Sequence, residues 1–110
     1  MKYGIPTDDG ATVAKVFGRA RKFAVCDEGG QPFKLFENEG AASEHGAGTG
    51  SAAFLAEKGV TVVIAPEVGP KATEALSVAG ISIEIAKAGL GLDEAIAGLE
   101  TTKDTGRSVR

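Results

Sequence analysis

The chain has 110 residues, of which 43% are hydrophobic and 25% charged, and its formal net charge is −3. This size and composition predict one globular domain with a single core and exclude a disordered chain. The negative charge argues against a nucleic-acid partner, and no apolar run reaches the roughly 18 residues of a membrane helix. Because the N-terminal residues become polar at Thr7, we expect neither a signal nor a transit peptide, and a cytoplasmic location.

The first half of the chain predicts three strands, which we place at Lys2–Pro6, Lys22–Asp27 and Pro32–Glu37. The first strand ends in a turn at residues 7–10. The second and third flank Glu28-Gly29-Gly30-Gln31, which is typical of a hairpin turn, so we expect an antiparallel pair. Residues 12–17, which end at Gly18, fit neither a helix nor a strand clearly.

The second half alternates helices and strands after a loop at residues 38–50. The expected helices are Ser51–Lys58, Lys71–Ala79 and Leu92–Leu99, and the expected strands are Val60–Ala65 and Ile81–Ile85. This alternation implies parallel strands joined by right-handed crossovers. We therefore predict an α/β domain over residues 1–99, with an antiparallel hairpin beside three parallel strands. Residues 100–110 lack apolar periodicity and are expected to form a flexible tail.

The most informative segment contains the only histidine of the chain, His45, at the start of a glycine run that leads into a predicted helix. Imidazole is the commonest metal-ligating side chain. Gly46, Gly48 and Gly50 would expose backbone N–H groups at a helix start, which suits an anion. The alternatives are a loop histidine that binds backbone and a flexible connection.

The single cysteine, Cys26, excludes an intramolecular disulfide, a zinc finger and a CxxC redox pair. Any metal centre must therefore use few protein thiolates. Cys26 lies within an apolar strand pattern, so we expect a buried and inert thiol, with metal ligation as the less favoured alternative.

Charged residues offer two further hypotheses. Arg19 belongs to a small basic cluster with two neighbouring cations, which would attract an anion but also fits a solvated strand edge. Asp8, Asp9 and Glu67 could together hold a divalent metal for phosphoryl chemistry. The favoured interpretation of the two aspartates is that they cap a turn.

Four motifs in this order resemble the dinitrogenase iron–molybdenum-cofactor-binding family, which includes nitrogenase accessory proteins and molybdenum–copper orange proteins. They are Ile5-Pro6-Thr7-Asp8-Asp9-Gly10, Phe17-Gly18-Arg19-Ala20, Glu44-His45-Gly46-Ala47-Gly48 and Glu67-Val68-Gly69-Pro70-Lys71-Ala72. The likeness spans residues 1–99. It implies a ribonuclease H-like fold, with a mixed five-stranded sheet flanked by about three helices, and binding of metal–sulfur clusters without catalysis.

The resemblance also implies where the ligand lies. It places the ligand between the glycine loop and the loops at residues 17–19 and 67–69. The implied contacts are His45, Gly46, Gly48, Phe17, Gly18, Arg19 and Gly69, with His45 as metal ligand and Cys26 as a weaker candidate. Val16 stands where many family members have a histidine, and Glu67 where some have a cysteine. A cluster that supplies its own sulfide and is held noncovalently is therefore expected.

These observations together predict a noncatalytic carrier or store of an anionic molybdenum–sulfur cluster, of the Mo–Cu sulfide or iron–molybdenum-cofactor type. We expect a monomer or weak homodimer in an anaerobic cell, with a protein partner that delivers or receives the cluster. Two alternatives stay open. One is a metal-dependent ribonuclease H-like nuclease that uses Asp8, Asp9 and Glu67, and the other is an interaction module that docks on a larger metalloprotein.

Overall fold

The computed structural model describes residues 1–28, 32–42 and 46–98, and the predicted tail and His45 lie outside them. Five strands form one mixed sheet in the spatial order β3-β2-β1-β4-β5. The strands are β1 (Lys2–Thr7), β2 (Lys22–Asp27), β3 (Lys34–Glu37), β4 (Val62–Ala65) and β5 (Ser82–Ile85). The helices are the 3₁₀ turn η1 (Glu39–Ala42), α1 (Ala47–Glu57) and α2 (Pro70–Val78), and residues 92–98 are also helical.

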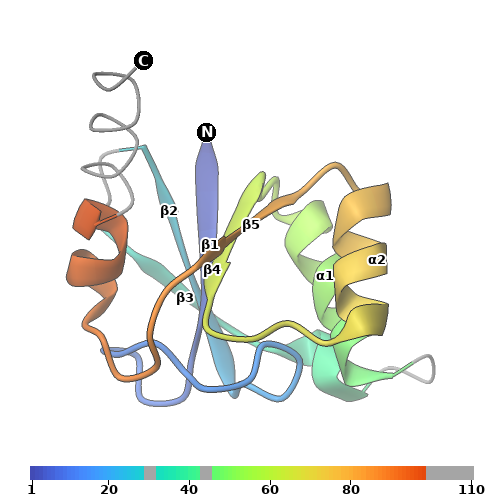
Figure 1. The fold of residues 1–110 in the computed structure, drawn as a ribbon, viewed down its shortest axis with the longest axis horizontal. Helices are drawn as coiled ribbons and strands as arrows, with labels where there is room; N and C mark the ends of the chain where they lie inside the picture. The colour runs from blue at the N-terminus through green and yellow to red at the C-terminus, as the bar shows by residue number, and fades with distance from the viewer. Residues whose placement is uncertain (29–31, 43–45, 99–110) are drawn as a thin grey trace.

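The pairing of the strands confirms the predicted mixed sheet (Figure 1). β1 pairs with β2 and β2 with β3 in antiparallel fashion, whereas β1 with β4 and β4 with β5 are parallel. A short connection allows β2 and β3 to form a hairpin, but parallel neighbours need a crossover. Helix α1 lies in the connection that leads to β4, and α2 joins β4 to β5.

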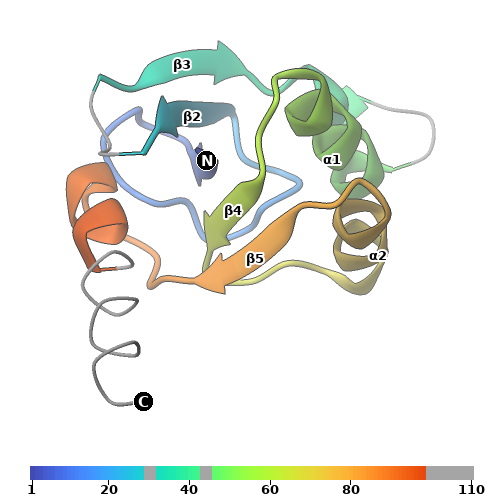
Figure 2. The ribbon, with the colours of Figure 1, turned by 90° about the horizontal axis from the view of Figure 1, so that it is seen from above.

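The sheet carries a hydrophobic core on each face, because successive side chains of a strand point to opposite sides. Figure 2 shows α1 and α2 on one side of the sheet and the helix at residues 92–98 on the other. The core under α1 and α2 includes Phe17, Phe23, Val25, Leu55, Val63 and Leu76. The core under the other helix includes Tyr3, Ile5, Cys26, Ile64, Leu92 and Ile96. The fold is therefore three-layered, with α1 and α2 packed side by side.

The predicted loop at residues 38–50 is wrong at both ends. Its first part forms η1, and α1 begins at Ala47 instead of Ser51. The N–H of Gly50 already donates to the carbonyl of Gly46 at 3.0 Å, which is the first turn of the helix. Glycine disfavours a helix by about 1 kcal/mol per residue relative to alanine, so the sequence pattern argued for a later start.

The segment after β1 forms no regular strand, although two of its residues are tied to a distant loop. The N–H of Val13 donates to the carbonyl of Leu90 at 2.8 Å, and the N–H of Leu92 donates to the carbonyl of Ala11 at 3.0 Å. These bonds hold the segment over the start of the helix at residues 92–98. None of the helices in the described ranges has the length and apolar character that crossing a membrane requires.

Candidate functional site

A cavity of about 420 Å³ opens where α1 and α2 begin. Three segments that are far apart in the sequence form its wall. The lining residues are Val16, Gly18 and Arg19 before β2, Gly46, Ala47, Gly48 and Thr49 at α1, and Gly69, Pro70, Lys71 and Ala72 at α2. These segments include the places where the family resemblance put the ligand.

Small residues allow the three segments to approach each other closely. A Cβ atom on Gly18 would lie 2.8 Å from the backbone nitrogen of Gly48, and one on Gly48 would lie 2.8 Å from Cβ of Ala72. Side chains at either glycine would push the wall segments apart. Gly48 therefore allows close packing in the first turn of α1, and it also lines the cavity at the N-terminus of that helix.

Buried groups hold the loop that contains Arg19. The ring of Phe17 is fully buried, with its centroid 5.2 Å from that of Phe23. Nδ2 of Asn38 donates to the carbonyls of Gly18, at 3.2 Å, and Ala20, at 2.9 Å. The loop is thus anchored by an aromatic contact and by a buried amide.

Ser51 completes this network from α1. Its Oγ donates to Oδ1 of Asn38 at 3.0 Å and lies 3.4 Å from the carbonyl oxygen of Gly18. Asn38 and Ser51 escaped the sequence analysis because their partners are distant in the chain, and no local pattern marks such a contact.

The electrostatic character of the cavity is positive. The N-caps of α1 and α2 are Gly46 and Gly69, and among the described residues no side chain caps either helix and no acidic residue occupies either first turn. The N-terminus of a helix carries about half a positive charge, so two such termini favour an anion. Arg19 and Lys71 line the same cavity and add to this charge.

Lys71 is a candidate site residue that the sequence analysis did not select. A cation in the first turn opposes the helix dipole, so helix stability does not explain this lysine. Its position directly after Gly69-Pro70, at a predicted helix start, was the signal available in the sequence.

Two glycines leave open space beside the cavity. A Cβ atom on Gly46 or Gly69 would have no heavy atom within 4 Å in the described structure. Gly46 has φ +105°, which favours glycine for conformational reasons. Gly69 has φ −65° and ψ 165°, an extended conformation that any residue adopts. Neither packing nor backbone geometry therefore accounts for glycine at position 69.

The other predicted contacts have different placements. Phe17 lies beneath the wall and does not line the cavity. Cys26 is buried in the core on the opposite face of the sheet, so its interpretation as a buried thiol is confirmed and it is not among the lining residues. His45 lies outside the described residues, although its neighbour Gly46 lines the cavity. Val16 is 44% exposed and forms an apolar part of the wall.

The paired aspartates stabilise backbone. Oδ1 of Asp9 accepts the N–H groups of Ala11 and Thr12, each at 2.8 Å, and Oδ2 accepts the hydroxyl of Thr12 at 2.9 Å. The bond from Ala11, followed by those from Thr12, lowers the pKa of Asp9 from 3.8 to about 2. Oδ1 of Asp8 accepts the N–H of Arg21 at 3.0 Å. The turn-capping interpretation is confirmed for Asp9, whereas Asp8 connects the turn to the residue before β2.

The nuclease alternative needs Asp8, Asp9 and Glu67 at one metal. Within residues 1–28, 32–42 and 46–98, no three His, Cys, Asp or Glu side chains gather where they could hold a metal ion. Glu67 is also absent from the residues that line the α1–α2 cavity.

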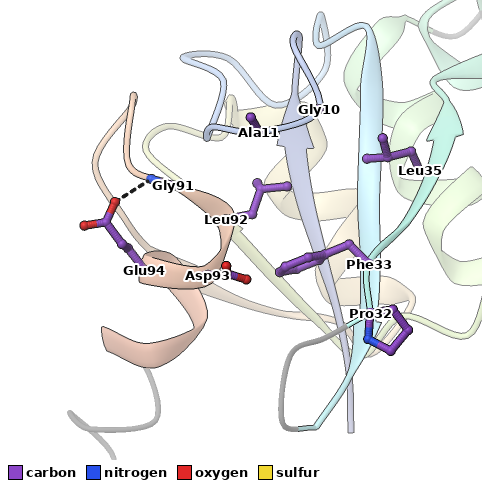
Figure 3. Close-up of a pocket in the computed structure, with 9 residues that line it drawn as sticks. All are labelled: Gly10, Ala11, Pro32, Phe33, Leu35, Gly91, Leu92, Asp93 and Glu94. Atoms are coloured by element: carbon purple, nitrogen blue, oxygen red, sulfur yellow. Dashed lines mark hydrogen bonds between the residues drawn. The ribbon is translucent and has the colours of Figure 1, made fainter.

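A second cavity, of about 540 Å³, lies on another part of the molecule (Figure 3). It is bounded by the turn after β1, the segment before β3 and the start of the helix at residues 92–98, and it includes Asp93 and Glu94. Oε1 of Glu94 accepts the N–H of Gly91 at 3.0 Å and so caps this helix. Carboxylates at a helix start disfavour an anion there, in contrast to the first cavity.

The chain is thus a small α/β domain with a basic cavity where α1 and α2 begin. Residues 1–102 match the family model described as dinitrogenase iron-molybdenum cofactor, and the chain belongs to this family. An uncharacterised protein of Methanocaldococcus jannaschii is 34% identical over 86 residues, which cover 76% of this chain and 72% of that protein.

Two solved structures are similar over most of their length. The apo form of the orange protein from Desulfovibrio gigas is 30% identical, with a TM-score of 0.83, and the match covers 92% of this chain and 88% of that one. A Thermotoga protein that has been provisionally assigned as a NifB protein is also 30% identical, with a TM-score of 0.74. That match covers 91% of this chain and 87% of the Thermotoga chain. These likenesses agree with the observed sheet and helices.

Proposed function

We propose that this chain carries or stores an anionic metal–sulfur cluster that contains molybdenum, held noncovalently where α1 and α2 begin. The observation that carries this proposal is the 420 Å³ cavity in which two helix N-termini meet Arg19 and Lys71. Membership of the cofactor family favours a metal–sulfur cargo over other anions. A Mo–Cu sulfide or iron–molybdenum-cofactor type would fit the proposal.

The cluster would be bound by backbone N–H groups, by the cationic side chains of Arg19 and Lys71, and by apolar contact with Val16. The only cysteine is buried elsewhere, so the cluster would bring its own sulfide. His45 would add one ligand beside Gly46. The proposal includes no catalytic step. It does include a ribonuclease H-like classification of the fold, a cytoplasmic location and a protein partner that exchanges the cluster.

Reconstitution tests the proposal directly. The purified protein is mixed with tetrathiomolybdate and a copper salt and passed over a sizing column. We expect charge-transfer absorbance and molybdenum to elute with the protein at a fixed ratio. Colour that separates from the protein at moderate ionic strength would overturn the proposed function.

Replacement of the histidine tests its part separately. His45→Ala should weaken retention of the cluster, because one ligand is lost, and the remaining cavity should still bind tetrathiomolybdate. Retention equal to that of the wild type would remove His45 from the site and leave the cavity in place.

Gly69→Ala tests whether the open space belongs to the ligand. The added methyl group meets no heavy atom of the described residues within 4 Å. Because Gly69 is the N-cap of α2 and alanine caps a helix less well than glycine, the free energy of unfolding should fall by about 1 kcal/mol. A methyl group that overlaps the cluster should reduce affinity about tenfold, since overpacking costs roughly 1–3 kcal/mol. Gly98→Ala is the matched control, because its Cβ also meets no heavy atom of the described residues within 4 Å and it lies in the helix on the other face. Equal affinity of the two variants would place the ligand elsewhere.

A further inference from the structure

We propose that Asn38 and Ser51 are positioning residues for the cavity, and that they act by fixing the backbone on both sides of Arg19. The inference rests on the proposed function, because it concerns how the same cavity is preorganised for an anion. Asn38 and Ser51 do not line the cavity themselves.

The hydrogen bonds of Asn38 determine which backbone groups are held. Its Nδ2 donates to the carbonyls of Gly18 and Ala20, which are the residues directly before and after Arg19. An amide has two N–H donors, and both are used here. The backbone of Arg19 is thus fixed at each end, while its side chain is exposed at the cavity.

The orientation of the amide is set by Ser51. Its Oγ donates to Oδ1 of Asn38 at 3.0 Å, so Nδ2 must face the two carbonyls. Asn38 is 8% exposed and Ser51 is fully buried, and no buried side-chain nitrogen or oxygen of the described residues lacks a partner. A buried network in which every group is paired permits one arrangement, since any other leaves a costly unpaired group.

The network also joins two walls of the cavity. Asn38 lies between β3 and η1, and its N–H donates to the carbonyl of Arg21 at 2.9 Å. Ser51 lies in α1, three positions after the lining residue Gly48, so the two side chains connect the Arg19 loop to the start of that helix. Apolar side chains could fill this space, but they would not hold the carbonyls. A cation whose backbone is fixed before the ligand arrives has less conformational entropy to lose on binding.

The test is a double-mutant cycle with tetrathiomolybdate as the probe. We measure its affinity for the wild type, Asn38→Ala, Arg19→Ala and the double variant. Asn38→Ala should weaken binding about tenfold, the equivalent of one lost buried hydrogen bond. In the Arg19→Ala background the same change should cost about twofold or less, because no guanidinium remains to be positioned. A loss of equal size in both backgrounds would show a merely structural role and overturn the inference.

Two further variants control for stability. Ile81→Val removes a buried methylene from the same core without touching the Arg19 loop, and its affinity should equal that of the wild type. If Asn38→Ala fails to fold, Ser51→Ala replaces it in the cycle, with an expected loss of about threefold. Wild-type binding that both Asn38→Ala and Ser51→Ala leave unchanged would overturn only this inference. A wild type that does not bind tetrathiomolybdate would overturn the proposed function, and the positioning role with it.

Discussion

Asp9 shows how one exposed carboxylate can hold a turn. Its bonds to the N–H groups of Ala11 and Thr12 lower its pKa to about 2. Because the pKa in the folded protein lies below that of the unfolded chain, the ionised group stabilises the fold. This stabilisation is complete above about pH 4 and is lost as the pH falls through the folded pKa.

Asp9→Asn should therefore lower the thermal midpoint at pH 7 and have a smaller effect near pH 2, where the wild-type carboxyl takes up a proton. Thermal unfolding followed by circular dichroism at both pH values measures this difference. Asp27→Asn, an exposed change of the same charge at the end of β2, is the control. An Asp9→Asn effect that is equal at both pH values would contradict the role of the ionised carboxylate.

At the scale of the element, α1 begins with residues that disfavour a helix. Its first turn is stabilised by contacts with Gly18, Ala72 and η1. Gly40 of η1 lies so close to α1 that a Cβ atom there would overlap the carbonyl group of Gly50. Packing against distant backbone therefore compensates for the poor helix propensity of this segment.

Gly40→Ala should destabilise the protein by about 1–3 kcal/mol, because η1 must move away from α1. Urea unfolding measures the change in the free energy of unfolding. Within the part of the chain that the structure describes, Gly98 has open space for a methyl group, so Gly98→Ala should be neutral or stabilising, since alanine is favoured over glycine in a helix. If the two variants have equal stability, η1 and α1 are not packed as tightly as the structure shows.

A comparison of the strands with α1 shows which parts of the fold could be predicted from the sequence. The apolar runs of β1, β2 and β4 and the turn between β2 and β3 are local signals, and they predicted the sheet and its mixed pairing. The start of α1 was wrong because Gly48, which argues against a helix, is required by its close approach to Ala72, which is far away in the chain.

The candidate site divides in the same way. Gly18, Arg19, Gly46 and Gly69 belong to motifs and were predicted as contacts. The positioning pair was not, because Asn38 is brought to the Arg19 loop by the pairing of β3 with β2 and not by any local pattern. A hydrogen bond between side chain and distant backbone leaves no periodic signal in a sequence.

At the scale of the whole molecule, one sheet supports two cores. The strands β2 and β4, which flank the central strand β1, contribute side chains to both cores, so loss of one core exposes the back of the other. The two faces should therefore unfold together in a single cooperative transition.

Leu76→Ala beneath α2 and Ile96→Val on the opposite face test this coupling. Large-to-small changes of these kinds cost about 2–5 and 0.5–1.5 kcal/mol. Since the two residues belong to different cores, their costs should add within about 0.5 kcal/mol. Denaturant unfolding measures the single and double variants, and two separate transitions would contradict one cooperative unit.

The cavity wall, finally, is assembled from segments at residues 16–19, 46–49 and 69–72. An unfolded chain does not bring these segments together, so an anion that binds the cavity selects the folded state. A ligand at one hundred times its dissociation constant stabilises a protein by about 2.7 kcal/mol. The protein with bound cluster would then be degraded by proteases more slowly than the protein without it. The concentration of the cluster in the cell would therefore determine how much of the protein accumulates.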